Sequence, residues 1–345
     1  MRVDPQDAGS VGAALTSFVA AHLGVAGVHL VAAAEQVPHG WDTYTYFFRV
    51  DGAGLPDDWM RPLVLRLYAD AEQQLCAETE VAIQCFVSGR GFPAARPLAF
   101  AGAEGPFGAP FMIMERLPGR TMVHAMGWNP FRAARLIKGM AAMHARLHAL
   151  PVDGWPLPDV GSPLVDRHLA VQREEAERLG VHVADEAMTW LEQRRGAVVP
   201  EDPALCHGDF HPLNLVVDRD GSMGAVDWGQ AAIGDRHFDV ANTLMVMTRI
   251  PTSSLGRVQR TFANVTRRWG AAGYRRAYNQ LRPLDERRMR YWEMFLCVRW
   301  WLIFEAIVSR RAATGLKEES ARYVQPQHVA AFRRRFEELA NVWTD

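Results

Sequence analysis

The first third of the chain alternates short apolar runs with turn residues, a pattern typical of strands that surround a few helices. An amphipathic helix is expected over residues 11–23 and a second helix over about 71–87, ended by Gly89-Arg90-Gly91. Five short apolar runs are predicted to be strands: Val28–Ala33, Tyr44–Val50, Pro62–Tyr68, Pro97–Phe100 and Pro110–Glu115. This region is therefore expected to form a small β-rich lobe.

After Leu117-Pro118-Gly119 the apolar spacing becomes helical. Within Phe131–Leu150, apolar residues recur at steps of three and four, which places them on one helix face. Helices are also expected over 164–195 and in 254–345, whereas 204–227 breaks this pattern with strand-like runs joined by an Asp220-Gly221 turn. The pattern predicts an α+β chain of two lobes, residues 1–116 and 117–345, the second mainly helical.

Composition excludes several classes of protein. The 345 residues are 49% hydrophobic and 22% charged, as in globular proteins, and exceed the length of a single ordinary core. A net charge of −1 gives no electrostatic basis for binding nucleic acid or an anionic membrane. The most apolar stretch, 291–308, is interrupted by Glu293, Arg299 and Glu305, so it predicts a buried helix rather than a membrane span.

The cysteines and the N-terminus favour a cytoplasmic protein. The chain has 4 cysteines without a C-x-x-C pair, which indicates reduced thiols, and residues 1–15 lack the apolar core of a signal peptide. We expect a monomer or homodimer. The chain has only two lysines, Lys138 and Lys317, so any cation needed in residues 1–137 must be Arg, His or a metal.

Polar residues concentrate between Cys206 and Asn214, and Asp227-Trp228-Gly229 follows thirteen residues later. The hairpin between them is expected to bring Asn214 and Asp227 close together. Carboxylate and amide oxygens suit a hard cation such as Mg²⁺, which leaves Asp209 as a base for a hydroxyl proton. This division of roles fits phosphoryl transfer, although Asn214 lies five residues after Asp209 rather than the spacing of protein kinases.

Other interpretations of these residues stay open. On a strand, His207, Asp209 and His211 would share a face and could bind Zn²⁺ or Mn²⁺, as in a metallohydrolase. A kinase-like protein that holds nucleotide without catalysis is a second alternative. His144 and His148 lie one helical turn apart, and we interpret them as solvated or core histidines rather than as a metal pair.

The motif H-G-D-x-x-x-x-N, followed by D-W-G, resembles the aminoglycoside phosphotransferase and choline kinase family of small-molecule kinases. The resemblance covers about residues 38–245 and implies a two-lobed protein-kinase-like fold. Further matching segments are Glu78–Leu98, Pro110–Gly119, Leu147–Leu150, Gly234-Asp235 and Phe238–Ala241.

The resemblance implies roles in the catalytic segment. Asp209 would be the catalytic base, and Asn214 and Asp227 would hold Mg²⁺. His207 would brace the catalytic loop, and Asp239 would hold that loop from a downstream helix.

The resemblance also implies how ATP, with GTP as an alternative, would be bound. Arg66 takes the place of the family's phosphate-binding basic residue, with Glu80 preferred over Glu78 as its ion-pair partner. The hinge near Glu115 and Leu117 would bind the adenine through backbone groups.

The phosphate loop is the weakest match. Gly40 is the only glycine between Val37 and Tyr44, so Thr43 and nearby amides would cover the phosphates. An ordinary hairpin turn accounts for this segment equally well.

The acceptor is expected to be a small molecule with a hydroxyl group: an aminoglycoside-like antibiotic, an amino alcohol or a sugar metabolite. Residues 288–310 are the candidate pocket wall, because acidic groups suit amines and aromatic faces suit quaternary ammonium groups. Core packing is the preferred interpretation of the aromatic side chains, and the pocket wall is the alternative. The candidate substrate residues are Asp235, Glu293, Trp300, Trp301 and Glu305.

Overall fold

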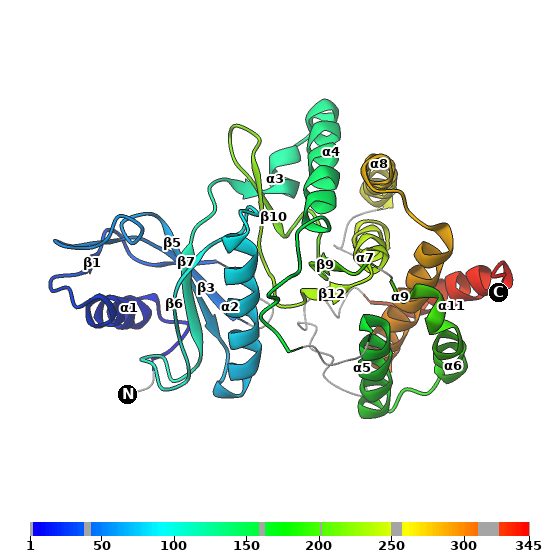
Figure 1. Ribbon diagram of the computed structural model, residues 1–345, viewed down its shortest axis with the longest axis horizontal. Helices are drawn as coiled ribbons and strands as arrows, with labels where there is room; N and C mark the ends of the chain where they lie inside the picture. The colour runs from blue at the N-terminus through cyan, green and yellow to red at the C-terminus, as the bar shows by residue number, and fades with distance from the viewer. Residues whose placement is uncertain are drawn as a thin grey trace. The chain divides into compact units, whose positions relative to one another are not determined.

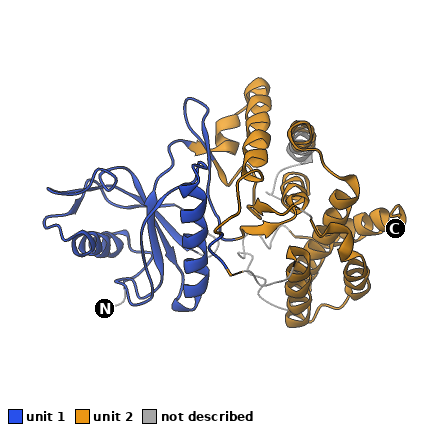
Figure 2. Cartoon of the chain, viewed as in Figure 1, with its two compact units in different colours: residues 1–119, 155–157, 216–229 blue, residues 120–154, 158–215, 230–345 orange. Residues whose placement is uncertain are grey.

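The computed structural model describes residues 3–37, 43–158, 163–200, 202–249, 257–309 and 324–344 (Figure 1). The chain divides into two compact units (Figure 2). The first comprises residues 1–119, 155–157 and 216–229, and the second comprises 120–154, 158–215 and 230–345. The sequence predicts a boundary between residues 116 and 117. In the structure the hairpin segment 216–229 belongs to the same compact unit as the N-terminal residues.

The first unit is built on an antiparallel five-stranded sheet. Its strands, in spatial order, are β2 (Glu35–Val37), β3 (Thr43–Phe48), β5 (Leu63–Tyr68), β7 (Phe111–Glu115) and β6 (Pro97–Ala101). Five further elements complete the N-terminal region: α1 (Ala8–Leu23), β1 (His29–Leu30) paired with β4 (Val50–Asp51), and the 3₁₀ turn Ala71–Gln73 leading into α2 (Gln74–Gly89).

Alternation along β5 gives the two faces of this sheet different partners. Leu63, Leu65 and Leu67 join the core that contains the buried side of α1. Val64 lies in a second cluster on the opposite face, the face that α2 covers (Figure 1). Arg66 shares the parity of Val64, so its side chain points toward α2.

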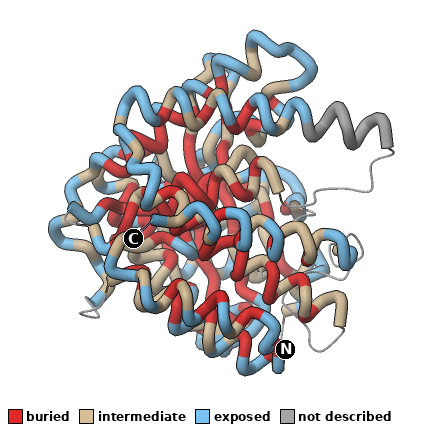
Figure 3. Tube along the Cα trace, turned by 90° about the vertical axis from the view of Figure 1, so that its right-hand side faces the viewer, coloured by how far each residue is buried: buried red, intermediate tan, exposed pale blue. Residues whose placement is uncertain are grey.

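The second unit is mainly helical. Its helices are α3 (Met122–Met126), α4 (Pro130–Leu147), α5 (Leu164–Leu179), α6 (Asp185–Arg194), α7 (Arg236–Thr248), α8 (Arg257–Leu281), α9 (Glu286–Val308) and α11 (Pro326–Asn341). The remaining short elements of the chain are β8 (Arg120–Thr121), the 3₁₀ turn Arg195–Val198, β9 (Ala204–Cys206), β10 (Leu215–Val217), β11 (Met223–Ala225) and β12 (Ala232–Gly234). Buried and exposed positions alternate along the helices, as their amphipathic sequences require (Figure 3).

Three element predictions need correction. Of the strand expected over Val28–Ala33, only His29 and Leu30 are strand. The helix expected over 164–195 is two helices, because Gly180 adopts a left-handed conformation (φ +63°) and its N–H bonds back to Ala176 and Glu177. The strand expected over 44–50 is interrupted after Phe48, and Val50 pairs instead with Leu30. The turn predicted at Pro38-His39-Gly40 lies outside the described residues.

Helix α9 is the central helix of the second unit, with buried residues along its whole length. It packs against α5, α6, α7 and α11. Residues 291–308, which the sequence predicts to be a buried helix, therefore lie in a buried helix. Among the described residues, no helix combines the length and the apolar character needed to cross a bilayer.

Candidate active site

The segment after β9 is a loop held in place by α7. The Asp239 carboxylate accepts hydrogen bonds from the backbone N–H groups of His207 and Gly208. Asn242 donates to the Gly208 carbonyl at 2.6 Å and Thr243 donates to the Phe210 carbonyl at 2.6 Å. Successive peptide groups of the loop are thus bonded to side chains on one helix, which fixes the backbone on both sides of Asp209.

Asp239 is itself held by two histidines from α4. Its Oδ2 atom lies 3.0 Å from His144 Nε2 and 3.2 Å from His148 Nε2. The other ring nitrogens, Nδ1, each lie 2.6 Å from a hydroxyl of α8, Tyr274 for His144 and Tyr278 for His148. Both histidines are buried core residues with hydrogen-bond partners, in agreement with the sequence interpretation.

This network lowers the pKa of Asp239. Burial alone would raise it, but His144, through its electrostatic interaction and hydrogen bond, and the hydrogen bond with His148 outweigh burial and hold the pKa well below its ordinary value. Asp239 is therefore a carboxylate, the form that accepts from both backbone N–H groups.

Gly208 gives the loop a backbone conformation that other residues rarely adopt. Its φ is +79°, and a Cβ atom there would lie 2.3 Å from the Gln230 carbonyl oxygen. Only glycine combines this conformation with this close approach.

Asp209 and Asn214 lie at opposite ends of the same loop and are bonded to each other. Asn214 Nδ2 donates to Asp209 Oδ2 at 2.9 Å and to the Asp209 carbonyl at 3.0 Å. His211 Nε2 lies 3.3 Å from Asp209 Oδ1. Burial would raise the pKa of Asp209, but His211 and then the other neighbours lower it, so the side chain is a carboxylate at neutral pH.

The second group of predicted residues lies in the first unit. Arg66 Nη2 bonds to Asp227 Oδ1 at 3.0 Å, and Arg66 Nε lies 3.3 Å from Glu80 Oε2. Tyr68 donates to Glu80 at 2.6 Å. The Arg66 partner is therefore Glu80, while Glu78 is exposed and bonds to Gln74.

Burial would lower the pKa of Arg66, but the carboxylates of Glu80 and Asp227 outweigh it and raise the pKa. Arg66 is consequently a fixed cation on a central strand. Because residues 1–137 contain no lysine, the buried cation at this position is an arginine.

Asp227 has an unusual backbone. Its φ of +70° makes it the one non-glycine residue with positive φ in the described ranges. Such strain persists only where the surroundings impose it, and it marks functional sites more often than others. The neighbouring Trp228 is fully buried with its ring 5.7 Å from that of Phe92, so packing on this side holds the turn.

Each of the two predicted cation ligands, Asn214 in the second unit and Asp227 in the first, has an oxygen atom available. The Asn214 amide nitrogen is committed to Asp209, which leaves the amide oxygen as a ligand. The Asp227 carboxylate side chain is 44% exposed and bonds to Arg66 through one oxygen, which leaves the other.

The predicted nucleotide contacts are only partly described. Leu117 follows β7, and its N–H donates to no acceptor in the described part of the chain, so it is available to a ligand. Glu115 ends β7 with its side chain bonded to Arg96 at 3.1 Å. Thr43 begins β3 opposite Tyr68, and Gly40 lies outside the described residues.

Most candidate substrate residues bond or pack within the protein. Asp235 is 2% exposed and bonded to His237 and Trp292. Glu293 pairs with Arg335 of α11 at 2.8 Å, and Trp301 is buried near Arg333 of the same helix. Trp300 and Glu305 are partly exposed.

The strand geometry behind the metallohydrolase alternative is wrong. Residues 207–211 form a loop, because β9 ends at Cys206 and Gly208 has positive φ. In the described part of the chain, the one cluster of metal-type ligands is His144, His148 and Asp239, whose ligand atoms are bonded to one another and to tyrosines.

Sequence analysis missed a polar group on the facing sides of α5 and α9. His168, Gln172 and Arg299 belong to it, and Arg299 interacts electrostatically with Asp209. Arg299 stood out in the sequence only as an interruption of an apolar stretch, and neither α5 residue belongs to a motif.

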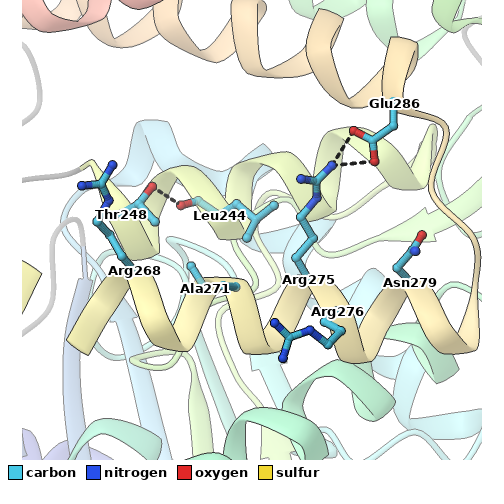
Figure 4. Close-up of a pocket in the computed structure, with 9 residues that line it drawn as sticks. Leu244, Thr248, Arg268, Ala271, Arg275, Arg276, Asn279 and Glu286 are labelled. Atoms are coloured by element: carbon cyan, nitrogen blue, oxygen red, sulfur yellow. Dashed lines mark hydrogen bonds and ion pairs between the residues drawn. The ribbon is translucent and has the colours of Figure 1, made fainter. Parts of the chain in front are cut away.

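A pocket of about 500 Å³ lies elsewhere in the second unit, between α7, α8 and the start of α9 (Figure 4). Arg275 and Glu286 form an ion pair across it. None of the predicted site residues lines it.

Comparison with known proteins identifies relatives of this arrangement. A model of the phosphotransferase enzyme family matches residues 33–284. An aminoglycoside 3'-phosphotransferase of Streptomyces fradiae is 29% identical over 147 residues, which are 39% of this chain and 52% of that protein. One from Escherichia coli is 25% identical over 139 residues, 38% of this chain and 50% of that protein. The chain thus spans about half the length of the curated relatives it matches.

Solved structures show the same fold. A putative aminoglycoside phosphotransferase from Ralstonia eutropha superimposes with a TM-score of 0.64 at 19% identity, covering 94% of this chain and 98% of that one. A spectinomycin phosphotransferase in complex with ADP and spectinomycin gives a TM-score of 0.57 at 13% identity, covering 94% and 98%. The chain therefore has a protein-kinase-like fold.

Proposed function

The chain belongs to the phosphotransferase enzyme family, and from this premise we propose that it is an ATP- and Mg²⁺-dependent O-phosphotransferase. It moves the γ-phosphoryl group of ATP, with GTP as the alternative donor, to a hydroxyl group of a small molecule. The acceptor class is an aminoglycoside-like antibiotic, an amino alcohol or a sugar metabolite. The proposal is supported chiefly by Asp209, bonded to Asn214 on a loop whose backbone is bonded to α7.

In the proposed reaction Asp209 orients the acceptor hydroxyl and accepts its proton. The acceptor oxygen forms a bond to the γ-phosphorus, and the bond from that phosphorus to the bridging oxygen of ADP breaks. The products are a phosphate ester, ADP and a proton, which Asp209 releases to solvent. Positioning and charge neutralisation account for most catalysis of this kind.

Asn214 and Asp227 would hold the cation through their remaining oxygens. Bound Mg²⁺ supplies charge neutralisation for the phosphate oxygens. Arg66 would bind phosphate with its position fixed by Glu80, and the free N–H of Leu117 would bind the nucleotide base.

The test measures ADP release by the full chain with Mg·ATP across acceptors: aminoglycosides, macrolides, choline, ethanolamine, sugars, homoserine and nucleosides. We expect acceptor-dependent ADP release that falls at least ~100-fold in kcat for Asp209→Asn. The control Asp220→Asn changes a fully exposed carboxylate in the hairpin turn and should leave kcat unchanged.

Full kcat in Asp209→Asn would remove Asp209 from the mechanism. Nucleotide binding with no ADP release for any acceptor would instead favour the alternative of a non-catalytic nucleotide-binding protein.

A further inference from the structure

Buried polar atoms without protein partners lie on the inner side of α5. In the ranges that the structure describes, His168 Nε2 and both polar atoms of the Gln172 amide are buried and accept or donate no hydrogen bond. Gln172 is only 5% exposed. Buried polar side-chain atoms in native proteins are nearly always bonded, so these atoms indicate a missing ligand or water.

Periodicity places these atoms opposite Arg299. His168 and Gln172 are one turn apart on one face of α5. The His168 ring lies 6.2 Å from Trp292 and 5.7 Å from Phe295 of α9. Trp292, Phe295 and Arg299 are spaced by three and four residues, so Arg299 continues the same face of α9 by one turn.

Electrostatic interactions agree with this placement. Arg299 interacts with His168 and Glu175 of α5 and with Asp209 of the catalytic loop. Gln172 lies between His168 and Glu175 along α5. The unpartnered atoms therefore lie in the same part of the second unit as the proposed base.

Arg299 is a cation without a direct ion pair to any described residue. In the described chain it forms no ion pair, and Glu175 is bonded to Arg178 through both carboxylate oxygens. Burial lowers the pKa of Arg299, with Asp209 and Glu175 opposing this. The Arg299 side chain is half-buried, and a guanidinium matches a carboxylate in a bidentate geometry, so Arg299 can bind an anionic oxygen group.

His168 adds no charge to the group. Burial lowers its pKa to about 3, with Arg299 acting in the same direction, so its ring is neutral at pH 7. The group therefore offers a cation, a carboxamide and a neutral imidazole.

We propose that the acceptor of this chain carries, besides its reacting hydroxyl, an anionic oxygen group that binds Arg299 with hydrogen bonds to Gln172 and His168. The inference rests on the proposed phosphotransferase function and, among small molecules with a hydroxyl group, favours hydroxy acids over aminoglycosides and amino alcohols. A polycationic acceptor would bring an ammonium group toward the Arg299 guanidinium and is disfavoured.

Binding is tested separately from turnover. The full chain labelled with ¹⁵N-histidine is titrated with glycerate, gluconate and homoserine in the presence of Mg·ADP. Each acid is compared with the corresponding primary amide, which lacks the carboxylate charge. We expect at least one acid to shift the His168 imidazole signal at a concentration at least ~10-fold lower than its amide. No acid shifting that signal, or equal effects of acid and amide throughout, would overturn the inference.

Substitutions of Arg299 test whether its guanidinium is the positive charge that binds the acid. Arg299→Gln should raise the concentration needed at least ~10-fold, and Arg299→Lys should recover part of the loss. Arg287→Gln, an exposed arginine on the same helix, should bind as wild type does. Unchanged binding in Arg299→Gln would remove Arg299 from the site, and Arg299→Lys still tests the position if Arg299→Gln does not fold.

Turnover then separates the two proposals. An acid that binds through Arg299 but is never phosphorylated leaves the anion site standing and contradicts the phosphotransferase function. Phosphorylation of neutral or polyamine acceptors at least as efficiently as hydroxy acids contradicts the anion site and leaves the phosphotransferase function standing.

Discussion

Asp227 combines a strained backbone with a functional side chain. Its φ of +70° is tolerated best by Gly, Asn and Asp, so Asp227→Asn should keep the fold while removing the charge. We predict that this variant needs several-fold more Mg²⁺ to reach half-maximal activity, because an amide is a weaker ligand than a carboxylate. Activity measured against Mg²⁺ concentration checks this, and an unchanged Mg²⁺ curve would argue against a metal role for Asp227.

Gly208 offers a second test at the scale of one residue. Gly208→Ala meets both a positive φ and the Gln230 carbonyl, so it should lower the free energy of unfolding by ~2–4 kcal/mol and abolish activity. Gly180→Ala has a similar φ of +63° in open space and should cost only ~1–2 kcal/mol with activity retained. Urea unfolding of both variants checks the difference; equal losses would mean that the Gln230 contact is unimportant.

At the scale of elements, α4, α7 and α8 meet in a buried network that should make stability depend on pH. His148 faces His144, Asp239, Tyr278 and Arg282, and burial followed by His144 lowers its pKa to about 3. An unfolded histidine has a pKa of ~6.5, so below that pH the unfolded chain binds a proton that the folded chain does not.

The free energy of unfolding should therefore fall as pH decreases from ~6.5 toward 3, by up to ~1.4 kcal/mol per pH unit for each such histidine. Urea unfolding at pH 7 and pH 5 measures this, and His148→Gln should reduce the slope even if it lowers stability. The exposed His182→Gln is the control. A slope that His148→Gln leaves unchanged would contradict the assignment of this proton to His148.

Helices and strands with a strong apolar periodicity were predictable from sequence, whereas the elements that pack against them were not. Helix α4 and strand β5 lie close to their predicted ranges, because packing on one face fixes their period. Gly180 ends a helix that the sequence pattern predicts to continue to residue 195. The anion-binding group was missed because His168 and Arg299 meet only through the packing of α5 on α9, to which no local motif contributes.

At the scale of the whole molecule, the predicted site residues fall into two groups. Asp209 and Asn214 belong to the second unit, and Arg66, Glu80 and Asp227 belong to the first. The family's motif predicted the members of each group by type and spacing. The sequence did not show that Glu293 and Trp301 of α9 contact arginines of α11. Because these two side chains are engaged with α11, we expect residues outside the motif to bind the substrate.

The central claim is that one phosphoryl group moves from ATP to an acceptor hydroxyl at Asp209. The most direct measurement is ³¹P NMR of Mg·ATP and an acceptor incubated with the wild-type chain, with Asp209→Asn and with Asp220→Asn. We expect ADP and a phosphate-ester signal to grow together for wild type and Asp220→Asn and to be nearly absent for Asp209→Asn. Phosphate-ester formation at the wild-type rate in Asp209→Asn, or ADP growing only with free inorganic phosphate, would contradict it.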